Sequence, residues 1–168
     1  MSENRLAVVV LAAGMGARMK SQYPKVLHPV GGTPIIGHIL KRANQIGADR
    51  VVVVTGPKMT EVIEFVAPVE AVIQEKPLGT GHAVLTTRNI LEGAADDVLV
   101  LFGDTPLLTE GTMKMMIETR RGKNNPAVVV LGFTPDDPLE YGRLVIGENG
   151  QLEKIVEFKD CDDEEKKI

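Results

Sequence analysis

The 168-residue sequence has very few of the residues that build covalent crosslinks or metal clusters. It contains one cysteine, Cys161, and no tryptophan, and aromatic residues make up 4% of the chain. One cysteine forms neither a disulfide nor a thiolate metal cluster within a single chain. This cysteine usage is typical of proteins kept in a reducing compartment. We therefore expect a cytoplasmic protein without a disulfide framework.

An excess of positive charge and a long apolar run are also lacking. The 19 lysines and arginines are outnumbered by 23 aspartates and glutamates, which gives a net charge of −4. This balance does not predict the basic face that holds nucleic acids. The apolar run 6–11 is too short for a membrane span and leads into glycines. We expect no nucleic acid or membrane partner, and any bound anion should be small.

The apolar residues that are present alternate between two patterns. They make up 43% of a chain whose length suits one domain of about 100–200 residues. Short runs of Val, Leu and Ile are typical of strands covered on both faces. The expected strands are 6–11, 51–55, 69–74, 98–102 and 127–133. The expected helices are 33–47, with Thr33 as cap, Pro34 in the first turn and Gly47 at its end, then 59–66, 79–91 and 109–121.

This alternation predicts an α/β fold, a Rossmann-like doubly wound and mostly parallel sheet with helices on both faces. The pattern changes in "RLVIGENGQLEKIVE", residues 143–157, where Asn149-Gly150 predicts a β-hairpin that leaves the main sheet. The tail that follows is charged and has no apolar face. We expect Cys161, within this tail, to be exposed and incidental.

A glycine-containing loop follows the first expected strand. Gly14 and Gly16 free the backbone to approach a phosphate or a base and to aim N–H groups at it. Arg18, Lys20 and Lys25 then supply positive charge. The loop lacks the third glycine of a dinucleotide fingerprint and the Gly-Lys-Ser/Thr of a P-loop. By itself it also fits a tight turn with solvated cations.

A carboxylate follows another expected strand in "VLVLFGDTPLL". Parallel strands deliver their carboxyl ends to one edge of a sheet, so Asp104 is expected beside the glycine loop. Its oxygens suit Mg²⁺ as a hard ligand. The alternative is a turn that Asp104 begins before Pro106. A phosphate cradle, cations and a carboxylate together favour phosphoryl or nucleotidyl transfer, which requires positioning and charge neutralisation.

Six motifs occur in the order "LAAGMGARM", "PKVLHPVGG", "QEKPLGTGHAV", "LFGDTPLL", "YGRLV" and "IVEFKD". In this order and over almost the whole chain, the sequence resembles the uridylyltransferase domain of the bifunctional bacterial enzymes that make UDP-N-acetylglucosamine. The first two motifs are shared with many sugar-phosphate nucleotidyltransferases. "QEKPLGTGHAV" and "YGR" are more selective.

The resemblance implies a role for each matching residue. Gln74 suits uracil because an amide offers both a donor and an acceptor. From the residues alone, Gln74 also fits a solvated strand end, Thr80 a helix cap and Glu157 a surface position of the hairpin. The implied roles are nucleotide contacts by Leu11, Ala12, Ala13 and Gly14, catalytic charge at the triphosphate from Arg18 and Lys25, uracil recognition by Gln74, Gly79 and Thr80, a Mg²⁺ ligand in Asp104, and sugar contacts by Gly142 and Glu157.

The reaction implied is transfer of a uridylyl group from UTP to N-acetylglucosamine 1-phosphate, with Mg²⁺ as cofactor. Alternatives are another sugar phosphate or nucleotide, or a nucleotide-binding module without turnover. The resemblance also implies a second metal ligand after "IVEFKD". We therefore expect residues 1–168 to be a nucleotidyltransferase domain truncated on its C-terminal side, with a homo-oligomer expected in a longer chain.

The three histidines, His28, His38 and His82, do not show the spacing of metal ligands. We interpret His82, inside "GTGHA", as a residue that positions the expected uracil loop without taking part in the chemistry.

Overall fold

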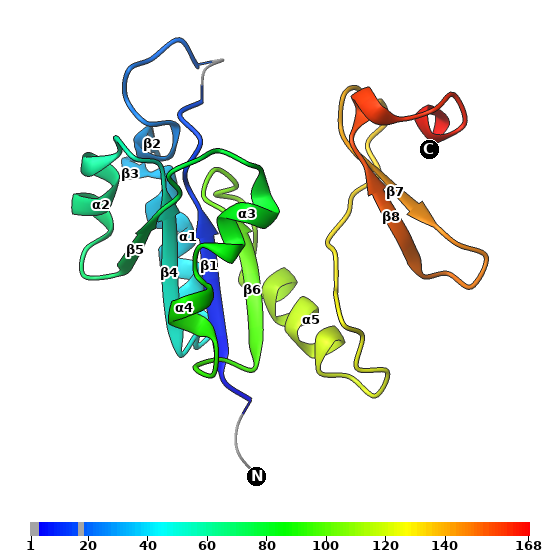
Figure 1. The fold of residues 1–168 in the computed structure, drawn as a ribbon, viewed down its shortest axis with the longest axis horizontal. Helices are drawn as coiled ribbons and strands as arrows, with labels where there is room; N and C mark the ends of the chain where they lie inside the picture. Colours follow the sequence, from blue (N-terminus) through cyan, green and yellow to red (C-terminus); the bar gives the residue numbers. More distant parts are fainter. Residues whose placement is uncertain (1–3, 17–18) are drawn as a thin grey trace. The chain divides into compact units, whose positions relative to one another are not determined.

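The computed structural model describes residues 4–16 and 19–168. The chain divides into two compact units, residues 1–126 and residues 127–168. The first unit contains a four-stranded sheet with its helices, and the second contains a two-stranded hairpin (Figure 1).

The sheet of the first unit is fully parallel. Its strands are β1 (Leu6–Leu11), β4 (Arg50–Thr55), β5 (Glu70–Ile73) and β6 (Asp97–Phe102), in the order β5-β4-β1-β6. Ala7, Val8, Val9 and Val10 of β1 have no exposed surface, as expected for a central strand that is covered on both faces. The predicted strands 6–11, 51–55, 69–74 and 98–102 are confirmed to within one residue at each end.

Helices cover both faces of this sheet, which confirms the doubly wound α/β prediction. On one face, α1 (Ile35–Gln45), α2 (Thr60–Val66) and α5 (Glu110–Arg120) contribute buried side chains such as Ile36, Val62 and Met113. On the other face, α3 (Thr80–Leu85) and α4 (Arg88–Leu91) contribute Ala83 and Leu91 (Figure 1). Among these described helices, none has the length and apolarity that a membrane crossing requires.

Two helix predictions need correction. Thr33 does not cap α1 and Pro34 is not in its first turn, because both form β3 (Thr33–Pro34), which pairs antiparallel with β2 (Pro29–Val30). The helix expected over 79–91 is divided at Thr86 and Thr87. Their hydroxyl groups donate to Ala83 O at 2.6 Å and Val84 O at 2.7 Å, a local bond that competes with the helical pattern.

Two predicted helix ends are confirmed. Gly47 follows α1 with a φ of 72°, and its N–H donates to Asn44 O. Thr109 caps α5, the helix predicted over 109–121, because its Oγ1 accepts from Thr112 N at 3.1 Å. The cap satisfies one of the free N–H groups in the first turn of α5.

The second unit contains the predicted hairpin. Strands β7 (Arg143–Ile146) and β8 (Leu152–Val156) pair antiparallel, and Gly150 has a φ of 74° in the turn between them. Two short 3₁₀ helices follow, η3 (Phe158–Asp160) and η4 (Glu165–Lys167). The guanidinium of Arg143, 5.3 Å from the centre of the Phe158 ring, joins the hairpin to η3.

The strand predicted over 127–133 does not form, and these residues have no regular structure. Val128 and Phe133 are 72% and 67% exposed. Within the described chain, β6 pairs only with β1, and 127–133 joins no ladder. An apolar run of strand-forming residues becomes a strand only when a neighbour accepts its backbone hydrogen bonds, which is why the prediction was wrong here.

The prediction that Cys161 is exposed was also wrong. Cys161 is 7% exposed, and its Sγ donates to Glu157 O at 3.4 Å. The charged tail folds over it because its charges pair locally. Glu165 accepts from Asp162 N and from Lys154 Nζ, and the hydrogen bond from Lys154 lowers the pKa of Glu165.

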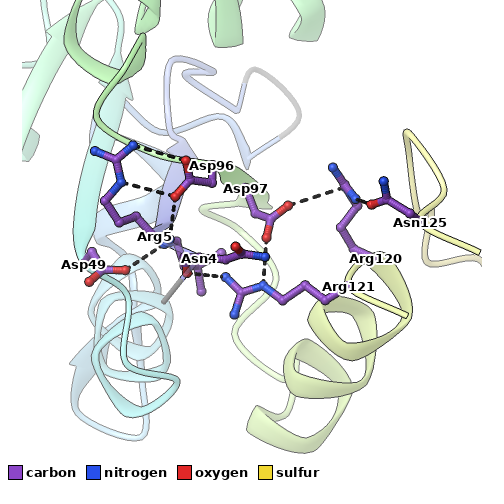
Figure 2. A network of polar contacts seen from close by, with 9 residues as sticks. Asn4, Arg5, Asp49, Asp96, Asp97, Arg120, Arg121 and Asn125 are labelled. Atoms are coloured by element: carbon purple, nitrogen blue, oxygen red, sulfur yellow. Dashed lines mark hydrogen bonds and ion pairs between the residues drawn. The ribbon is translucent and has the colours of Figure 1, made fainter. Parts of the chain in front are cut away.

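The amino edge of the sheet, where β1 and β6 begin, carries a network of ionic contacts (Figure 2). Asp96 accepts from Arg5 N at 2.8 Å and from Arg5 Nη2 at 3.1 Å. Asp97 pairs with Arg120 and, at 2.7 Å, with Arg121. The hydrogen bond from Arg5 holds the pKa of Asp96 below its usual range. These contacts tie β1, β6 and α5 together at one edge.

Candidate functional site

A cavity of about 320 Å³ lies where the strands of the first unit end. It is lined by residues that follow three of the four strands, together with the first turn of α3. This position agrees with the general rule that ligands of open α/β sheets bind outside the carboxyl ends of the strands. The lining residues are Leu11, Ala12, Ala13, Gly14, Lys25, Val26, Gln74, Pro77, Gly79, Thr80, Ala83, Phe102 and Asp104.

The loop after β1 presents its backbone to the cavity. Ala12 is buried and its N–H donates to Val54 O at 2.8 Å, which fixes the start of the loop to β4. A Cβ added at Gly14 would meet no atom within 4 Å, so the chain borders open space there. Gly16 has a φ of 73°, and a Cβ on it would lie 2.7 Å from Lys25 Cβ. Glycine at 16 is therefore required for Lys25 to pack beside the loop.

The turn after β6 carries Asp104 to the same place. Gly103 N donates to Leu11 O at 2.9 Å. A Cβ at position 103 would lie 3.0 Å from the same oxygen, a tight contact that favours glycine at this position. The chain turns at this point, but the turn begins at Phe102 and not at Asp104 as the alternative expected, with Thr105 N and Thr105 Oγ1 both donating to Phe102 O, at 3.3 Å and 2.8 Å. It is compatible with the functional interpretation because it brings the Asp104 carboxylate to the cavity.

Lys25 and Asp104 form an ion pair in the cavity. Lys25 Nζ lies 2.7 Å from Asp104 Oδ2, and both side chains are 35% exposed. Lys25 begins the 3₁₀ helix η2 (Lys25–Leu27), and the next two residues, Val26 and Leu27, are buried. These apolar anchors hold the lysine stem at the wall while its ammonium group meets solvent. The cavity thus has one end where an anion and its counter-cation can be held.

The other end of the cavity is formed by Gln74 and the loop that leads to α3. Gln74 N donates to Thr55 O at 2.8 Å, one residue beyond β5, and the residue is 5% exposed. It is therefore not a solvated strand end. Its Nε2 donates to Gly79 O at 3.2 Å and lies 3.0 Å from His82 Nδ1. A buried amide with fixed hydrogen-bond partners is suited to distinguish one base edge from another.

The structure brings most of the predicted site residues to this cavity. Gly142 and Glu157 lie in the second unit, where they flank the paired residues Arg143 and Val156 and are exposed. Arg18 lies outside the described residues. The predicted residues that line the cavity are Leu11, Ala12, Ala13, Gly14, Lys25, Gln74, Gly79, Thr80 and Asp104.

Four further lining residues are absent from the sequence-based prediction: Val26, Pro77, Ala83 and Phe102. The sequence contains a pattern that could have placed Phe102 at the site, because this residue ends an apolar strand immediately before Gly103 and Asp104. Phe102 is 51% exposed, so its apolar surface is accessible at the cavity wall. An aromatic ring at the cavity wall is suited to contact the flat face of a ligand.

A divalent cation would meet one protein carboxylate in the cavity. Within the described residues, no group of three or more His, Cys, Asp or Glu side chains is arranged to hold a metal. Asp104 is nevertheless a hard oxygen ligand at the cavity wall. Mg²⁺ is commonly bound through one or two carboxylates, with water and substrate phosphates completing its shell. The residues present therefore fit a cation that arrives with a phosphate ligand.

The cavity, the glycine loop and the parallel sheet are features of a nucleotide-binding transferase. The chain belongs to the family described as "MobA-like NTP transferase domain", which matches residues 8–158. The bifunctional protein GlmU of Paramagnetospirillum magneticum is 54% identical over 161 residues, which are 96% of this chain and 36% of that protein. The chain thus spans about a third of the length of this curated relative.

Solved structures agree with the family assignment. HddC from Yersinia pseudotuberculosis, complexed with GMP-PN, is 27% identical and superposes with a TM-score of 0.68 over 90% of this chain and 68% of that chain. Rv0371C from Mycobacterium tuberculosis, complexed with manganese, is 23% identical and has a TM-score of 0.57 over 68% of this chain and 59% of its own. The second likeness concerns the fold alone.

Proposed function

We propose that this chain transfers a uridylyl group from UTP to N-acetylglucosamine 1-phosphate, giving UDP-N-acetylglucosamine and pyrophosphate. The observation that carries the proposal is the arrangement of the cavity, with a fixed amide at one end and an ion pair at the other. A nucleoside triphosphate has a base, which suits the amide end, and a charged phosphate chain, which suits the end with the ion pair. The identity to GlmU supports uridine and an amino sugar as the particular substrates.

At the amide end, Gln74, Gly79 and Thr80 bind the uracil ring in this proposal. Gln74 is buried beside the cavity, so a base that leaves its polar atoms unpaired would bind less well. The backbone of Leu11 to Gly14 approaches the nucleotide from the opposite wall. Phe102, the last residue of β6, contributes apolar surface on the strand that leads to Asp104.

At the charged end, Lys25 faces the triphosphate, and Arg18 is assigned the same task by sequence. A phosphate oxygen of the sugar phosphate attacks the α-phosphorus of UTP, and the bond from that phosphorus to the bridging oxygen of pyrophosphate breaks. No proton needs to be removed from the attacking phosphate. The protein's contribution is to hold the groups in line and to neutralise negative charge.

Asp104 is the proposed ligand of Mg²⁺. When bound, the cation supplies positive charge to the reacting phosphates. Without it, the Asp104 carboxylate is paired with Lys25 at 2.7 Å, so Lys25 must leave Asp104 when it turns to the nucleotide. Gly142 and Glu157 of the second unit are the proposed sugar contacts, in which the Glu157 carboxylate accepts hydrogen bonds from hydroxyl groups.

The test is to incubate the purified chain with UTP, N-acetylglucosamine 1-phosphate and Mg²⁺ and to measure pyrophosphate and UDP-sugar. Binding of UTP, CTP and GTP is compared by calorimetry in parallel. We expect UTP to bind best and pyrophosphate to appear only with both substrates and Mg²⁺. Equal binding of the three nucleotides would contradict the assignment to uridine. UTP-selective binding without any product would instead support the alternative, a nucleotide-binding module without turnover.

A further inference from the structure

His82 contacts the buried amide of Gln74 and is not among the residues that line the cavity. It lies in the first turn of α3, with its Nδ1 3.0 Å from Gln74 Nε2. The next residue, Ala83, is buried against the sheet, and Thr86 N donates to His82 O at 3.1 Å. This backbone hydrogen bond and the burial of Ala83 fix the backbone that carries the imidazole.

The chemistry of the partners determines which way the Gln74 amide is turned. Gly79 O is a carbonyl oxygen and can only accept, so the group that meets it at 3.2 Å must be the amide NH₂. The same NH₂ faces His82 Nδ1. This nitrogen must therefore carry a lone pair, which places the imidazole proton on Nε2.

Both N–H groups of Gln74 are then engaged, one with Gly79 O and one with His82 Nδ1. The amide has one polar atom left for a ligand, Oε1, and this atom only accepts. A pyrimidine that offers a donor at ring position N3 satisfies it, and uracil does so. Cytosine has an unprotonated N3 and places an acceptor against the same oxygen.

We propose that His82 is a positioning residue that sets uracil-over-cytosine selectivity by holding the Gln74 amide with its oxygen toward the base. The proposal rests on the proposed function, because it requires a pyrimidine at this end of the cavity. With His82 absent, Gly79 O still orients the amide from one side. The Gln74 N–H that had donated to His82 Nδ1 is then free to donate to a base. This reduces the penalty against cytosine.

The test compares the ratio of UTP affinity to CTP affinity in three chains, measured by calorimetry. His82→Ala should lower this ratio roughly five- to tenfold, the worth of one hydrogen bond. His82→Asn should keep it within about twofold, because an asparagine oxygen replaces Nδ1 as the acceptor. Equal ratios in all three chains would overturn the proposal while leaving the uridylyl transfer intact.

Two further measurements separate positioning from direct contact. In a Gln74→Ala background, His82→Ala should not change the ratio further, and an undiminished effect there would show that His82 acts on the base itself and would overturn the proposal. Nitrogen-15 NMR of the free chain, with His82→Asn to assign the signals, should show an unprotonated Nδ1 at His82. A proton on Nδ1 would overturn it even if His82→Ala fails to fold. No UTP preference in the unsubstituted chain would overturn the proposed function and this inference together.

Discussion

The two edges of the same four-stranded sheet are built in opposite ways. At the amino edge, Arg5 pairs with Asp96 and Arg121 pairs with Asp97 (Figure 2). At the carboxyl edge, the Asp104 carboxylate is paired with Lys25 alone among the described residues, and both border a cavity. One edge uses its polar groups to hold strands together, and the other leaves them available to a ligand.

Substitutions at the amino edge should therefore affect stability, and substitutions at the carboxyl edge should affect binding. Asp97 is 9% exposed and meets two arginines from α5 and its C-terminal end, so its loss leaves partners that are partly buried. The Lys25–Asp104 pair is about a third exposed, and solvent-screened pairs of this kind contribute little to folding. Function and stability are therefore expected to separate along the strand direction.

The largest effect should come from Asp104→Asn at the carboxyl edge. Loss of the carboxylate removes the proposed Mg²⁺ ligand, so we expect Mg²⁺-dependent pyrophosphate release to fall at least about 100-fold. Stability to urea should change by less than about 1 kcal/mol. Asp96→Asn, the matched aspartate at the amino edge, should leave the rate of pyrophosphate release unchanged. Similar rates for both variants would remove the functional contrast between the edges.

The next effect is that of Gln74→Ala on nucleotide affinity. We expect UTP binding to weaken by about 1–3 kcal/mol, the cost of leaving a buried base edge without its hydrogen bonds. Calorimetry measures the affinity, and circular dichroism should show an unchanged fold. Glu75→Ala, an exposed neighbour in the same loop, is the control. UTP binding as strong as in the parent chain would exclude Gln74 as the residue that recognises the base.

A smaller effect, of the opposite kind, is expected from Asp97→Ala at the amino edge. The substitution leaves Arg120 and Arg121 without their carboxylate, and we expect a loss of about 1–2 kcal/mol in the free energy of unfolding. Urea unfolding followed by circular dichroism measures this loss, and UTP affinity should stay the same. Arg88→Ala, in a pair whose members are 66% exposed, should cost less than about 0.5 kcal/mol. A reduced UTP affinity with unchanged stability would contradict the assignment of the amino edge to stability.

The smallest effect concerns the loss of folding stability at acid pH. Because the pKa of Asp96 is lowered in the folded chain, its contribution to stability is present above the unfolded pKa of about 4 and is lost as the pH falls through the folded value. Between about pH 5 and pH 3, the unsubstituted chain should therefore lose more stability than Asp96→Asn. Other carboxylates with lowered pKa values, such as Glu165, are present in both chains. Parallel stability curves would show that the Arg5–Asp96 pair contributes nothing.

The sequence predicts the sheet well because its strands are short, valine-rich and bounded by glycine or polar residues. It also predicts that Gly14 and Asp104 share an edge, since each follows a strand and parallel strands end together. The place of Gln74 in the site was implied by the family resemblance. The same logic fails for 127–133, where the residues favour a strand and no neighbouring strand accepts their hydrogen bonds. Thr33 fails in a similar way, because its backbone pairs with Val30 before the helix begins.

Contacts between side chains were harder to predict than edges. The bond between Gln74 and His82 depends on how the intervening loop folds back, which residue types alone do not determine. The burial of Cys161 was missed because the tail looks uniformly charged. In the structure its charges pair with one another and with Lys154, which allows the backbone to close over the thiol.

The rate at which this buried thiol is modified can be used to measure the opening of the second unit. Cys161 is the single cysteine of the chain and is 7% exposed, so a thiol-modifying reagent reaches it only when the tail opens. When reclosing is faster than modification, the labelling rate measures the free energy of that opening. Since the first unit has no cysteine, the kinetics report on residues 127–168 alone. Labelling slowed by a sugar phosphate would then register occupancy of the hairpin without any enzymatic turnover.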